Sequence, residues 1–440
     1  MKNLFCIVAG LLLAYVSEGQ IISTIAGCDS CGLIGDGGPA TNAQLFHPIS
    51  VAFDAGGNCY ITDRDHDRIR KVTPAGIITT IAGTGVGGFS GDGGQATAAK
   101  IANPYGIALD AAGNIYFADF NRIRKINAAG IITTIAGTGT GSYNGENIPA
   151  TTAGIQPGGV AIDNAGTIYF ADGNERIRKI DASGLITTIA GTGFAGYNGD
   201  EIPATNAELN RPNYVAVDPV GNIFVADNLN NRVRKIDASG IIHTIAGDGA
   251  SGYSGDNGPA TDAMLNGPLG VFADNLGNIY IGDTYNNVVR KINVSGTITS
   301  IAGNGIGGFS GDGGLAVLAK LGYPLGIAMD VTGNVYIADE ANNRIRQITS
   351  TVFVHQINSE YDLRVFPNPI KNYITINLIS NVNELMKVIV VDIAGHKMGE
   401  ISGMTNIPIN IKLEKMPQGI YMLNAWTENS LFTKKIIKTE

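Results

Sequence analysis

The sequence predicts an all-β protein: a six-bladed β-propeller closed by its N-terminal strand, followed by a small C-terminal β-sandwich. The first observation behind this prediction is a segment that recurs six times, in one copy as GNIYFADFNRIRKINAAGIITTIAG at residues 113–137. It contains three runs rich in β-branched and aromatic residues, separated by residues that suit tight turns. The second observation is the spacing, because the Asp that ends the second strand of each copy recurs every 53 to 56 residues. These residues are Asp63, Asp119, Asp172, Asp227, Asp283 and Asp339.

Each copy has the same order of elements. An apolar strand that follows a Pro, as in PYGIALD at residues 104–110, comes first, and the strands IYFAD, RIRKI and IITTIAG follow it. Four short strands in every repeat of about 55 residues are typical of propeller blades. A leucine-rich or helical repeat would instead show a shorter unit or a period of 3.6 residues. The repeat therefore favours a propeller.

The phase of the repeat predicts how the ring closes. Residues 21–27 read IISTIAG, which is a fourth strand without the first three before it. The last copy ends after its third strand, NRIRQI at residues 343–348. Joining these two ends would complete the sixth blade and remove both free sheet edges. We therefore expect the propeller to span residues 20–350.

Composition limits the function. The chain has 440 residues, of which 60 are Gly, 44% are hydrophobic and 15% are charged, and its net charge is −8. This apolar content is sufficient for a large core, so a disordered chain is not expected. An acidic protein repels phosphate backbones, and no long basic run is present, so we expect no nucleic-acid partner.

The N-terminal segment has the features of a targeting signal. Lys2 precedes an apolar stretch at residues 4–16, and small residues at 17 and 19 suit cleavage before Gln20. A stretch of this length is too short to span a bilayer comfortably. We interpret residues 1–19 as a signal peptide and expect an exported protein with no transmembrane segment in the mature chain.

Three cysteines follow this segment. In an exported protein Cys28 and Cys31 could form a small surface disulfide, which would leave Cys59 as a buried thiol in a strand. A zinc site is the alternative, but further ligands at suitable spacing are not evident.

Charged residues recur in every copy. The Asp that ends the second strand and an Arg in the third, for example Asp119 and Arg124, flank the same turn six times. An active site needs one asymmetric group of residues, so we interpret the sixfold pairs as ion pairs that hold the blades. A second acidic residue recurs in the Gly-rich link between blades, at Asp36, Asp92, Glu146, Asp200, Asp256 and Asp312. A role in capping a turn is the preferred interpretation, and a calcium site is the alternative, although one carboxylate per link supplies few ligands.

The repeat PxGIAxDxxGNxYxADxxNxRIRKIxxxGxITTIAG resembles NHL repeats. The links with FSGDGG and PAT resemble those of exported bacterial NHL proteins, and the resemblance covers residues 21–349. It implies a six-bladed propeller that serves as a binding scaffold. Some members of the family, the amidating lyases, are enzymes with metal and catalytic side chains in the central cavity.

The tail at residues 361–440 follows a linker at residues 351–360 and contains alternating strand segments that predict a small sandwich. It resembles the type A sorting domain of the type IX secretion route. The matching segments are FPNP at residues 366–369, VVDIAGHKM, Gly419-Ile420-Tyr421 and Lys434-Lys435-Ile436. The resemblance implies that the type IX machinery is a partner. It also implies a secreted or cell-surface location, reached through the periplasm and across the outer membrane.

Function is expected where the repeats differ. Around the Pro that opens each inner strand, near one mouth of the channel, the copies carry different polar and aromatic residues of a kind that binds small ligands or peptide ends. The predicted ligand-binding residues are His47, Asn103, Tyr105, Gln156, Arg211, Asn213, Tyr214 and Tyr323. We expect them to bind an extracellular protein, peptide or glycan. The alternative is that they only hydrate the channel mouth.

An enzymatic role has little support in the sequence. The chain has 5 His, and no set of three His or carboxylates is found at the inner positions. A GxSxG motif is also missing. We therefore expect a non-catalytic binding scaffold without a cofactor or metal, and keep a metal-dependent lyase or hydrolase in the channel as the alternative.

Overall fold

The computed structural model describes residues 20–28, 35–349, 361–366, 373–380, 383, 385–392, 397–413, 416–426 and 431–439. The chain divides into two compact units between residues 350 and 351. The predicted signal peptide, the predicted linker at 351–360 and Cys31 lie outside the described residues.

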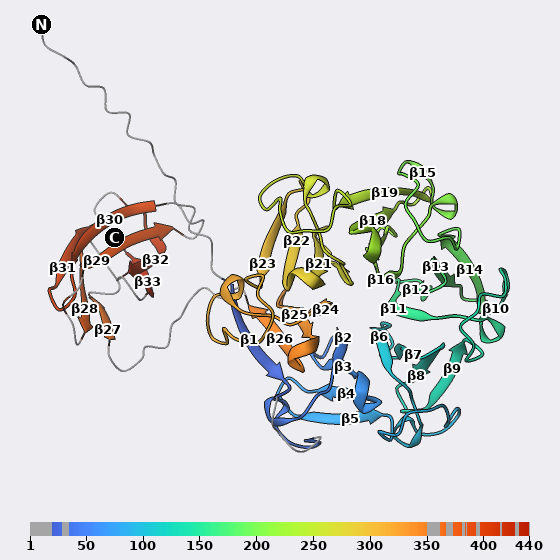
Figure 1. The fold of residues 1–440 in the computed structure, drawn as a ribbon. Coiled ribbons are helices and arrows are strands. Elements are labelled where there is room, and N and C mark those ends of the chain that lie inside the picture. Colours follow the sequence, from blue (N-terminus) through green and yellow to red (C-terminus); the bar gives the residue numbers. More distant parts are fainter. Residues whose placement is uncertain are drawn as a thin grey trace, which may run out of the picture. The chain divides into compact units, whose positions relative to one another are not determined.

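The first unit consists of six antiparallel sheets that form a ring (Figure 1). Each sheet contains four main strands, which follow sequence order in the first five blades, whereas β1 supplies the fourth strand of the last blade. The first strands contact one another around the centre, and β24 closes on β2. The first strands are β2 (Pro48–Phe53), β6 (Pro104–Leu109), β11 (Pro157–Ile162), β16 (Pro212–Val217), β20 (Gly270–Ala273) and β24 (Pro324–Met329). The second strands are β3 (Cys59–Asp63), β7 (Ile115–Asp119), β12 (Ile168–Asp172), β17 (Ile223–Asp227), β21 (Ile279–Asp283) and β25 (Val335–Asp339).

The third and fourth strands complete each blade. The third strands are β4 (Arg68–Val72), β8 (Arg122–Ile126), β13 (Arg176–Ile180), β18 (Arg232–Ile236), β22 (Val288–Ile292) and β26 (Arg344–Thr349). The fourth strands are β5 (Ile78–Ala82), β9 (Ile132–Ala136), β14 (Leu185–Ala190), β19 (Ile241–Ala246), β23 (Ile298–Ala302) and β1 (Ile21–Ala26). Two short strands, β10 (Ile148–Pro149) and β15 (Ile202–Pro203), extend the third and fourth blades.

The N-terminal strand closes the ring as predicted. β1 pairs antiparallel with β26, so that Ile21 lies opposite Thr349 and Ile22 opposite Ile348. The other edge of β1 is also paired, because the Ile22 N–H donates to the Gly314 carbonyl at 3.0 Å and the Ala316 N–H donates to the Gln20 carbonyl at 2.8 Å. β1 is therefore hydrogen-bonded along both of its edges.

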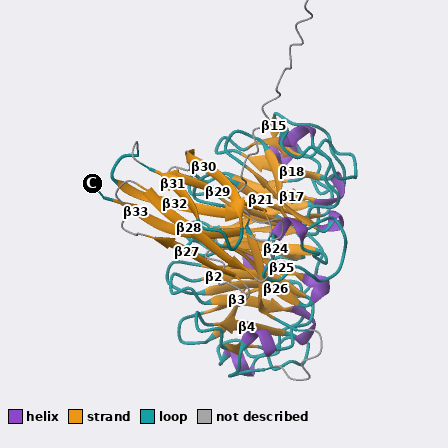
Figure 2. Cartoon of the chain, turned by 90° about the vertical axis from the view of Figure 1, so that its left-hand side faces the viewer, coloured by secondary structure: helices purple, strands orange, loops and turns teal. Residues whose placement is uncertain are grey.

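The links between blades cover the outer edges of the sheets. In every blade the fourth strand is bridged to the incoming link, for example Gln95 to Ile131. Short 3-10 helices lie in these links (Figure 2). They are η1 (Ala40–Asn42), η3 (Ala96–Ala98), η4 (Ala150–Thr152), η5 (Ala204–Asn206), η7 (Ala260–Asp262) and η9 (Ala316–Leu318). Paired edges have no free N–H and C=O groups to recruit another strand.

The core of this unit lies between the faces of neighbouring blades. One buried cluster joins Ile61 and Val72 of the first blade to Tyr336, Ala338 and Ile345 of the last. Comparable clusters lie between other adjacent blades. Each blade thus buries its apolar face against the next, which a single four-stranded sheet cannot do alone.

The repeated Arg of the third strand is the centre of a clamp in each blade. The six side chains, Arg70, Arg124, Arg178, Arg234, Arg290 and Arg346, are fully buried. Each pairs with the Asp that ends the second strand, as Arg124 does with Asp119 at 2.9 Å. Each also pairs with the acidic residue of the link, as Arg124 does with Asp92 at 2.7 Å. The predicted structural role of the Asp–Arg pairs is confirmed.

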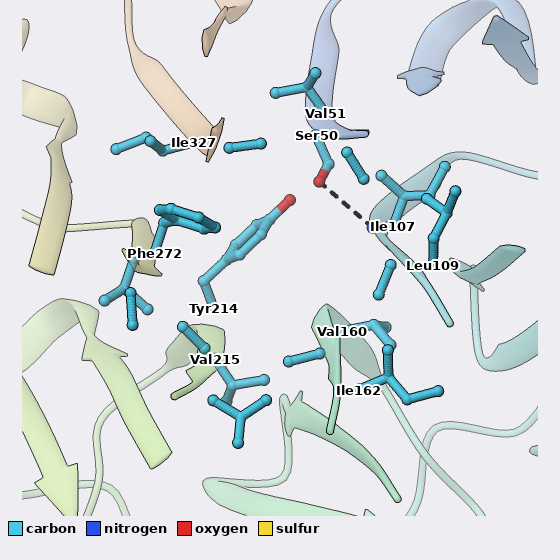
Figure 3. A pocket seen from close by; sticks show the side chains of 18 of the residues that line it. Ser50, Val51, Ile107, Leu109, Val160, Ile162, Tyr214, Val215, Phe272 and Ile327 are labelled. Atoms are coloured by element: carbon cyan, nitrogen blue, oxygen red, sulfur yellow. Dashed lines mark hydrogen bonds between the residues drawn. The ribbon is translucent and has the colours of Figure 1, made fainter. Parts of the chain in front are cut away.

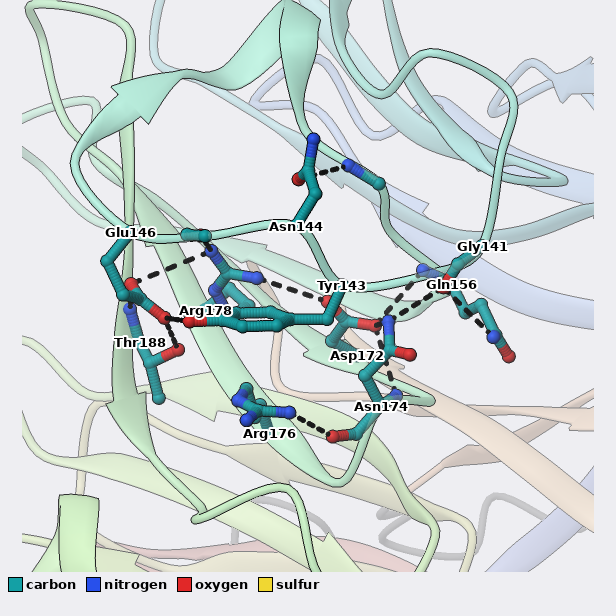
Figure 4. A network of polar contacts seen from close by, with 12 residues as sticks. Gly141, Tyr143, Asn144, Glu146, Gln156, Asp172, Asn174, Arg176, Arg178 and Thr188 are labelled. Carbon is teal, nitrogen blue, oxygen red and sulfur yellow. Dashed lines mark hydrogen bonds and ion pairs between the residues drawn. The ribbon is translucent and has the colours of Figure 1, made fainter.

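The acidic residue of the link therefore has a role that the sequence did not predict, because a guanidinium group neutralises its carboxylate. In the links to the second through sixth blades an aromatic residue three positions earlier adds a cation–π contact. In the third blade, for example, Tyr143 lies 4.0 Å from the guanidinium of Arg176 (Figure 4). In the same blade Glu146 contacts Arg178 at 3.6 Å. These contacts attach the Gly-rich link to the blade.

The second unit is a small sandwich of two antiparallel sheets. One sheet has the order β27-β28-β31 and the other β30-β29-β32-β33. The strands are β27 (Tyr361–Phe366), β28 (Tyr373–Ser380), β29 (Leu385–Asp392), β30 (Lys397–Met404), β31 (Ile409–Lys412), β32 (Gly419–Trp426) and β33 (Leu431–Lys438). Alternate residues such as Ile374, Ile376, Val388 and Val390 fill the space between the sheets.

Two further sequence predictions concern cysteines and membranes. Cys59 is a buried free thiol, as expected, and burial raises the pKa of its thiol. Cys28 is disulfide-bonded. Among the described residues, no helix has the length and apolar character needed to cross a membrane.

Candidate functional site

The central channel is lined by the six first strands and encloses a cavity of about 230 Å³. Its lining side chains are apolar except for the hydroxyl groups of Ser50 and Tyr214 (Figure 3). One position decides its width, the second residue after the Pro that opens each inner strand. The six blades place there Ser50, Gly106, Gly159, Tyr214, Gly270 and Gly326.

Tyr214 crosses the channel at this level. Its ring extends from β16 toward Ser50 on β2 (Figure 3) and is 5% exposed. A Cβ atom at Gly159 would lie 2.5 Å from the Tyr214 ring, so the space that the ring needs depends on glycine in the neighbouring blade. Among the described residues the Tyr214 hydroxyl makes no hydrogen bond of ordinary geometry, although it faces the Ser50 hydroxyl (Figure 3). Burial raises its pKa.

A second cavity, of about 270 Å³, lies at the start of the inner strands and forms the mouth pocket. Its lining residues are Ile49, Arg64, Tyr105, Leu269, Thr284, Tyr285, Tyr323, Leu325 and Glu340. The three aliphatic residues belong to or pack against the buried cluster that contains Tyr214. They form an apolar floor, and the Tyr214 side chain packs in the same cluster.

Tyrosine rings form the walls of the mouth pocket. Tyr285 and Tyr323 are about half exposed and meet edge to face, with ring centroids 5.9 Å apart. Tyr105 donates a hydrogen bond from its hydroxyl to Asn213 Oδ1 at 3.0 Å, and its ring lies 6.2 Å from that of Tyr214. Burial raises the pKa of the Tyr105 hydroxyl, so this group remains a neutral donor. Aromatic walls of this kind suit a ligand with apolar surface.

Short 3-10 helices bring charge to the pocket. The helices η2 (Arg64–His66), η8 (Thr284–Asn286) and η10 (Glu340–Asn342) follow the second strands of three blades and supply Arg64, Thr284, Tyr285 and Glu340. A fourth, η6 (Asn228–Asn230), occupies the same place in another blade. Arg64 Nε lies 3.7 Å from Asp65 Oδ1 and makes no hydrogen bond. Burial raises the pKa of Glu340, although nearby His47 and Arg64 oppose the shift.

Two of the eight predicted ligand-binding residues, Tyr105 and Tyr323, line the mouth pocket. Asn213 holds the Tyr105 hydroxyl, and Tyr214 lies in the channel below. The remaining four, His47, Asn103, Gln156 and Arg211, are outside the pocket lining.

The backbone of the residue before the Pro has a structural role in most blades. His47, Asn103, Arg211 and Tyr323 all have a positive φ, between 47° and 52°. Their N–H groups donate to side chains of the preceding blade, for example His47 to Asn343 Oδ1 at 2.8 Å and Arg211 to Glu175 Oε2 at 2.5 Å. Gln156 is bound through its side chain, which donates to the Gly141 carbonyl at 3.1 Å (Figure 4). The backbone bonds of the four residues with a positive φ join successive blades.

Sequence reasoning missed Arg64, Thr284, Tyr285 and Glu340. They follow directly after the regular Asp of the second strand, in a segment that reads as a simple turn. The signal that would have found them is their divergence, because the corresponding residues of the fourth blade are Asn228 and Leu229.

Within the residues that the structure describes, no cluster of three or more His, Cys, Asp or Glu side chains could hold a metal ion.

The ring of repeated four-stranded blades defines a β-propeller with a ligand-sized pocket at one mouth. Family models agree: the teneurin NHL domain matches residues 87–146, 141–198 and 192–253, and the NHL repeat matches residues 321–348. The secretion system C-terminal sorting domain matches residues 364–439. The chain thus contains NHL repeats in its propeller and a secretion system sorting domain at its C-terminal end.

Similar proteins include much larger ones. Human Teneurin-1 is 28% identical over 385 residues, a match that covers 76% of this chain but 13% of Teneurin-1. Teneurin-m of Drosophila melanogaster is 25% identical, and the match covers 74% of this chain and 13% of that protein. The chain thus spans a small part of the length of these relatives.

Solved structures share the fold. A protein of unknown function from Bacteroides thetaiotaomicron VPI-5482 is 22% identical with a TM-score of 0.56, covering 75% of this chain and 76% of that one. An auxiliary nutrient binding protein from Bacteroides ovatus ATCC 8483 is 17% identical with a TM-score of 0.54 and the same coverage.

Proposed function

We propose that this protein is an exported, non-catalytic binding module that captures its ligand in the mouth pocket. The observation that carries the proposal is the composition of that pocket. Three tyrosine rings, one guanidinium and one carboxylate, contributed by four blades, surround an apolar floor. Binding sites commonly combine apolar and aromatic lining with a few polar groups that fix orientation. In the channel, by contrast, the side chains offer two hydroxyl groups and no carboxylate or imidazole.

The sorting domain supports a place of action outside the cell. We propose that it engages the type IX machinery after passage through the periplasm and delivers the propeller across the outer membrane. The extracellular partner would then be a peptide, protein or glycan that presents a small group to the mouth. The description of a solved propeller as a nutrient binding protein is in keeping with such a capture role.

Array binding with matched variants tests the site. The mature full chain is applied to peptide and glycan arrays, and hits are measured again with Tyr285→Ala and Tyr323→Ala. Val220→Ala is the control, because Val220 is 77% exposed in the turn between β16 and β17, outside the pocket. We expect at least a tenfold loss of affinity for each tyrosine variant and none for the control. Binding that survives both tyrosine changes would contradict the proposed site.

Metal content tests the non-catalytic part of the proposal. The purified mature chain is analysed for bound metal before and after treatment with a chelator. Zinc or calcium bound at one equivalent, together with loss of ligand turnover on its removal, would overturn a non-catalytic role.

A further inference from the structure

The mouth pocket is divided into an apolar half and a charged half, which restricts what it can bind. Ile49, Leu269 and Leu325 provide no hydrogen-bonding side chain, whereas Arg64 and Glu340 carry opposite charges. A ligand must therefore place apolar atoms on the floor, since a hydroxyl or amide left there unpaired would cost free energy. The volume of about 270 Å³ suits one residue-sized group rather than a longer ligand.

Arg64 has hydrogen-bonding capacity to spare. Its Nε is buried 3.7 Å from Asp65 Oδ1 without a hydrogen bond, and its Nη1 and Nη2 make no hydrogen bond among the contacts of the described residues. Glu340 lines the same pocket, yet the two side chains form no ion pair within 4.0 Å in the described part of the chain. A guanidinium presents paired donors that match a carboxylate, and charge-assisted hydrogen bonds of this kind are stronger than neutral ones.

We propose that the ligand is an apolar amino-acid residue with a free carboxylate, at the C-terminal end of a peptide or as a free amino acid. This inference rests on the proposed function and specifies its ligand. The apolar side chain lies on the floor between the tyrosine rings, and the carboxylate binds Arg64. The amide N–H, or the ammonium group of a free amino acid, donates to Glu340. A neutral sugar fits less well, because its hydroxyl groups would face the aliphatic floor.

Calorimetry on the mature full chain tests this inference with defined probes. They are acetyl-Gly-Gly-Leu with a free carboxylate, the same peptide as its C-terminal amide, free leucine, and methyl β-glucoside. We expect the acid to bind at least tenfold more tightly than the amide. Binding of free leucine in addition would identify a free amino acid as a second source of the same chemistry, and its absence would assign the site to peptide ends.

Variants that remove one charge test whether the ligand carboxylate binds Arg64 itself or responds only to the net charge of the protein. Arg64→Gln should weaken binding of the acid at least tenfold and remove the preference for acid over amide. Lys100→Gln is the matched control, because Lys100 is an exposed cation outside the pocket lining and the change in charge is the same. Glu340→Gln should weaken binding of free leucine more than that of the acetylated peptide if leucine binds. Thermal melts of all variants confirm that each is folded.

The results that overturn the ligand class differ from those that overturn the site. Equal affinity for acid and amide, selective binding of the glucoside, or no binding of any probe at millimolar concentration would each overturn the ligand class. If a probe other than the acid loses affinity in Tyr323→Ala, the mouth pocket stands as the site while its ligand is different. Affinity for the acid that is unchanged by Tyr285→Ala and Tyr323→Ala would overturn the mouth pocket itself.

Discussion

Replacement of Ile22 by Ala should destabilise the propeller selectively, because this side chain locks the closing strand. Ile22 is fully buried in the cluster between the last two blades, and its N–H and C=O groups also bond the link at Gly314 and Gly313. Truncation of a fully buried Ile to Ala costs about 2–5 kcal/mol. The unit unfolds with an entropy of roughly 2.1 cal/mol/K per residue, so we expect its melting temperature to fall by about 3–7 °C. The matched control is Ile21→Ala, since Ile21 is only partly buried and should cost less than about 1 kcal/mol.

The single tryptophan makes this measurement specific. Trp426 lies in β32 of the second unit, so its fluorescence reports that unit while far-UV circular dichroism and calorimetry report both. We expect Ile22→Ala to move the circular dichroism transition and to leave the fluorescence transition in place. Removal of residues 20–27 should have a larger effect of the same kind. If Ile22→Ala costs no more than Ile21→Ala, the reasoning on ring closure is refuted.

Three further predictions use urea titration of the mature chain followed by circular dichroism. Arg124→Ala leaves two carboxylates without their cation and should lower the free energy of unfolding by about 3–5 kcal/mol. Asp92→Asn removes a half-exposed carboxylate and should lower it by about 1 kcal/mol or less. Equal losses for the two variants would contradict the clamp. Tyr214→Ala opens the channel and should lower the free energy of unfolding by about 3–5 kcal/mol. Tyr214→Phe should lower it by less than about 1 kcal/mol, because the hydroxyl makes no hydrogen bond of ordinary geometry to the described residues. A larger loss in the Phe variant would show that the hydroxyl does make a stabilising hydrogen bond. Hydrogen bonds to Asp237 and Glu201 raise the pKa of His243, so its protonated form should add up to about 1 kcal/mol of stability below pH about 6.5. This contribution should disappear as pH rises through the folded pKa, and titrations at pH 5 and 8.5 should show no such difference in His243→Gln.

The sequence was sufficient to predict the ring and its closure. The regular spacing of the Asp residues predicts the repeated blades. The extra fourth strand at residues 21–27 predicts the pairing with β26 that closes the ring. The Arg clamp was only half predicted. Arg124 and Asp119 flank one turn and are neighbours in the sequence pattern, but Asp92 lies 32 residues before Arg124 and reaches it only because the link folds back along the blade. Local patterns do not report such a contact.

The mouth pocket contains only two of the residues that the sequence predicts to bind a ligand, Tyr105 and Tyr323. The residues around the Pro were chosen because they differ between blades. In most blades, however, the residue before the Pro serves to join blades through its backbone N–H, as His47 does by donating to Asn343. Arg64 and Glu340 belong to 3-10 helices that occur in four of the six blades and that no local propensity indicates. Tyr214 had a clear signal, since it replaces a residue that is glycine in four blades, but its direction across the channel depends on the closed ring.

Pairing of β1 with β26 also fixes the order in which the chain reaches its native state. The two strands lie more than 300 residues apart in the sequence, so their contact is the most non-local in the propeller and carries a large loop-closure entropy. Because β1 precedes every other strand of the propeller in the sequence, it can pair with β26 only when the last blade is also present. Until the two strands meet, the ring is open and the last blade lacks its fourth strand. Closure thus makes the two ends of the propeller depend on each other for their stability.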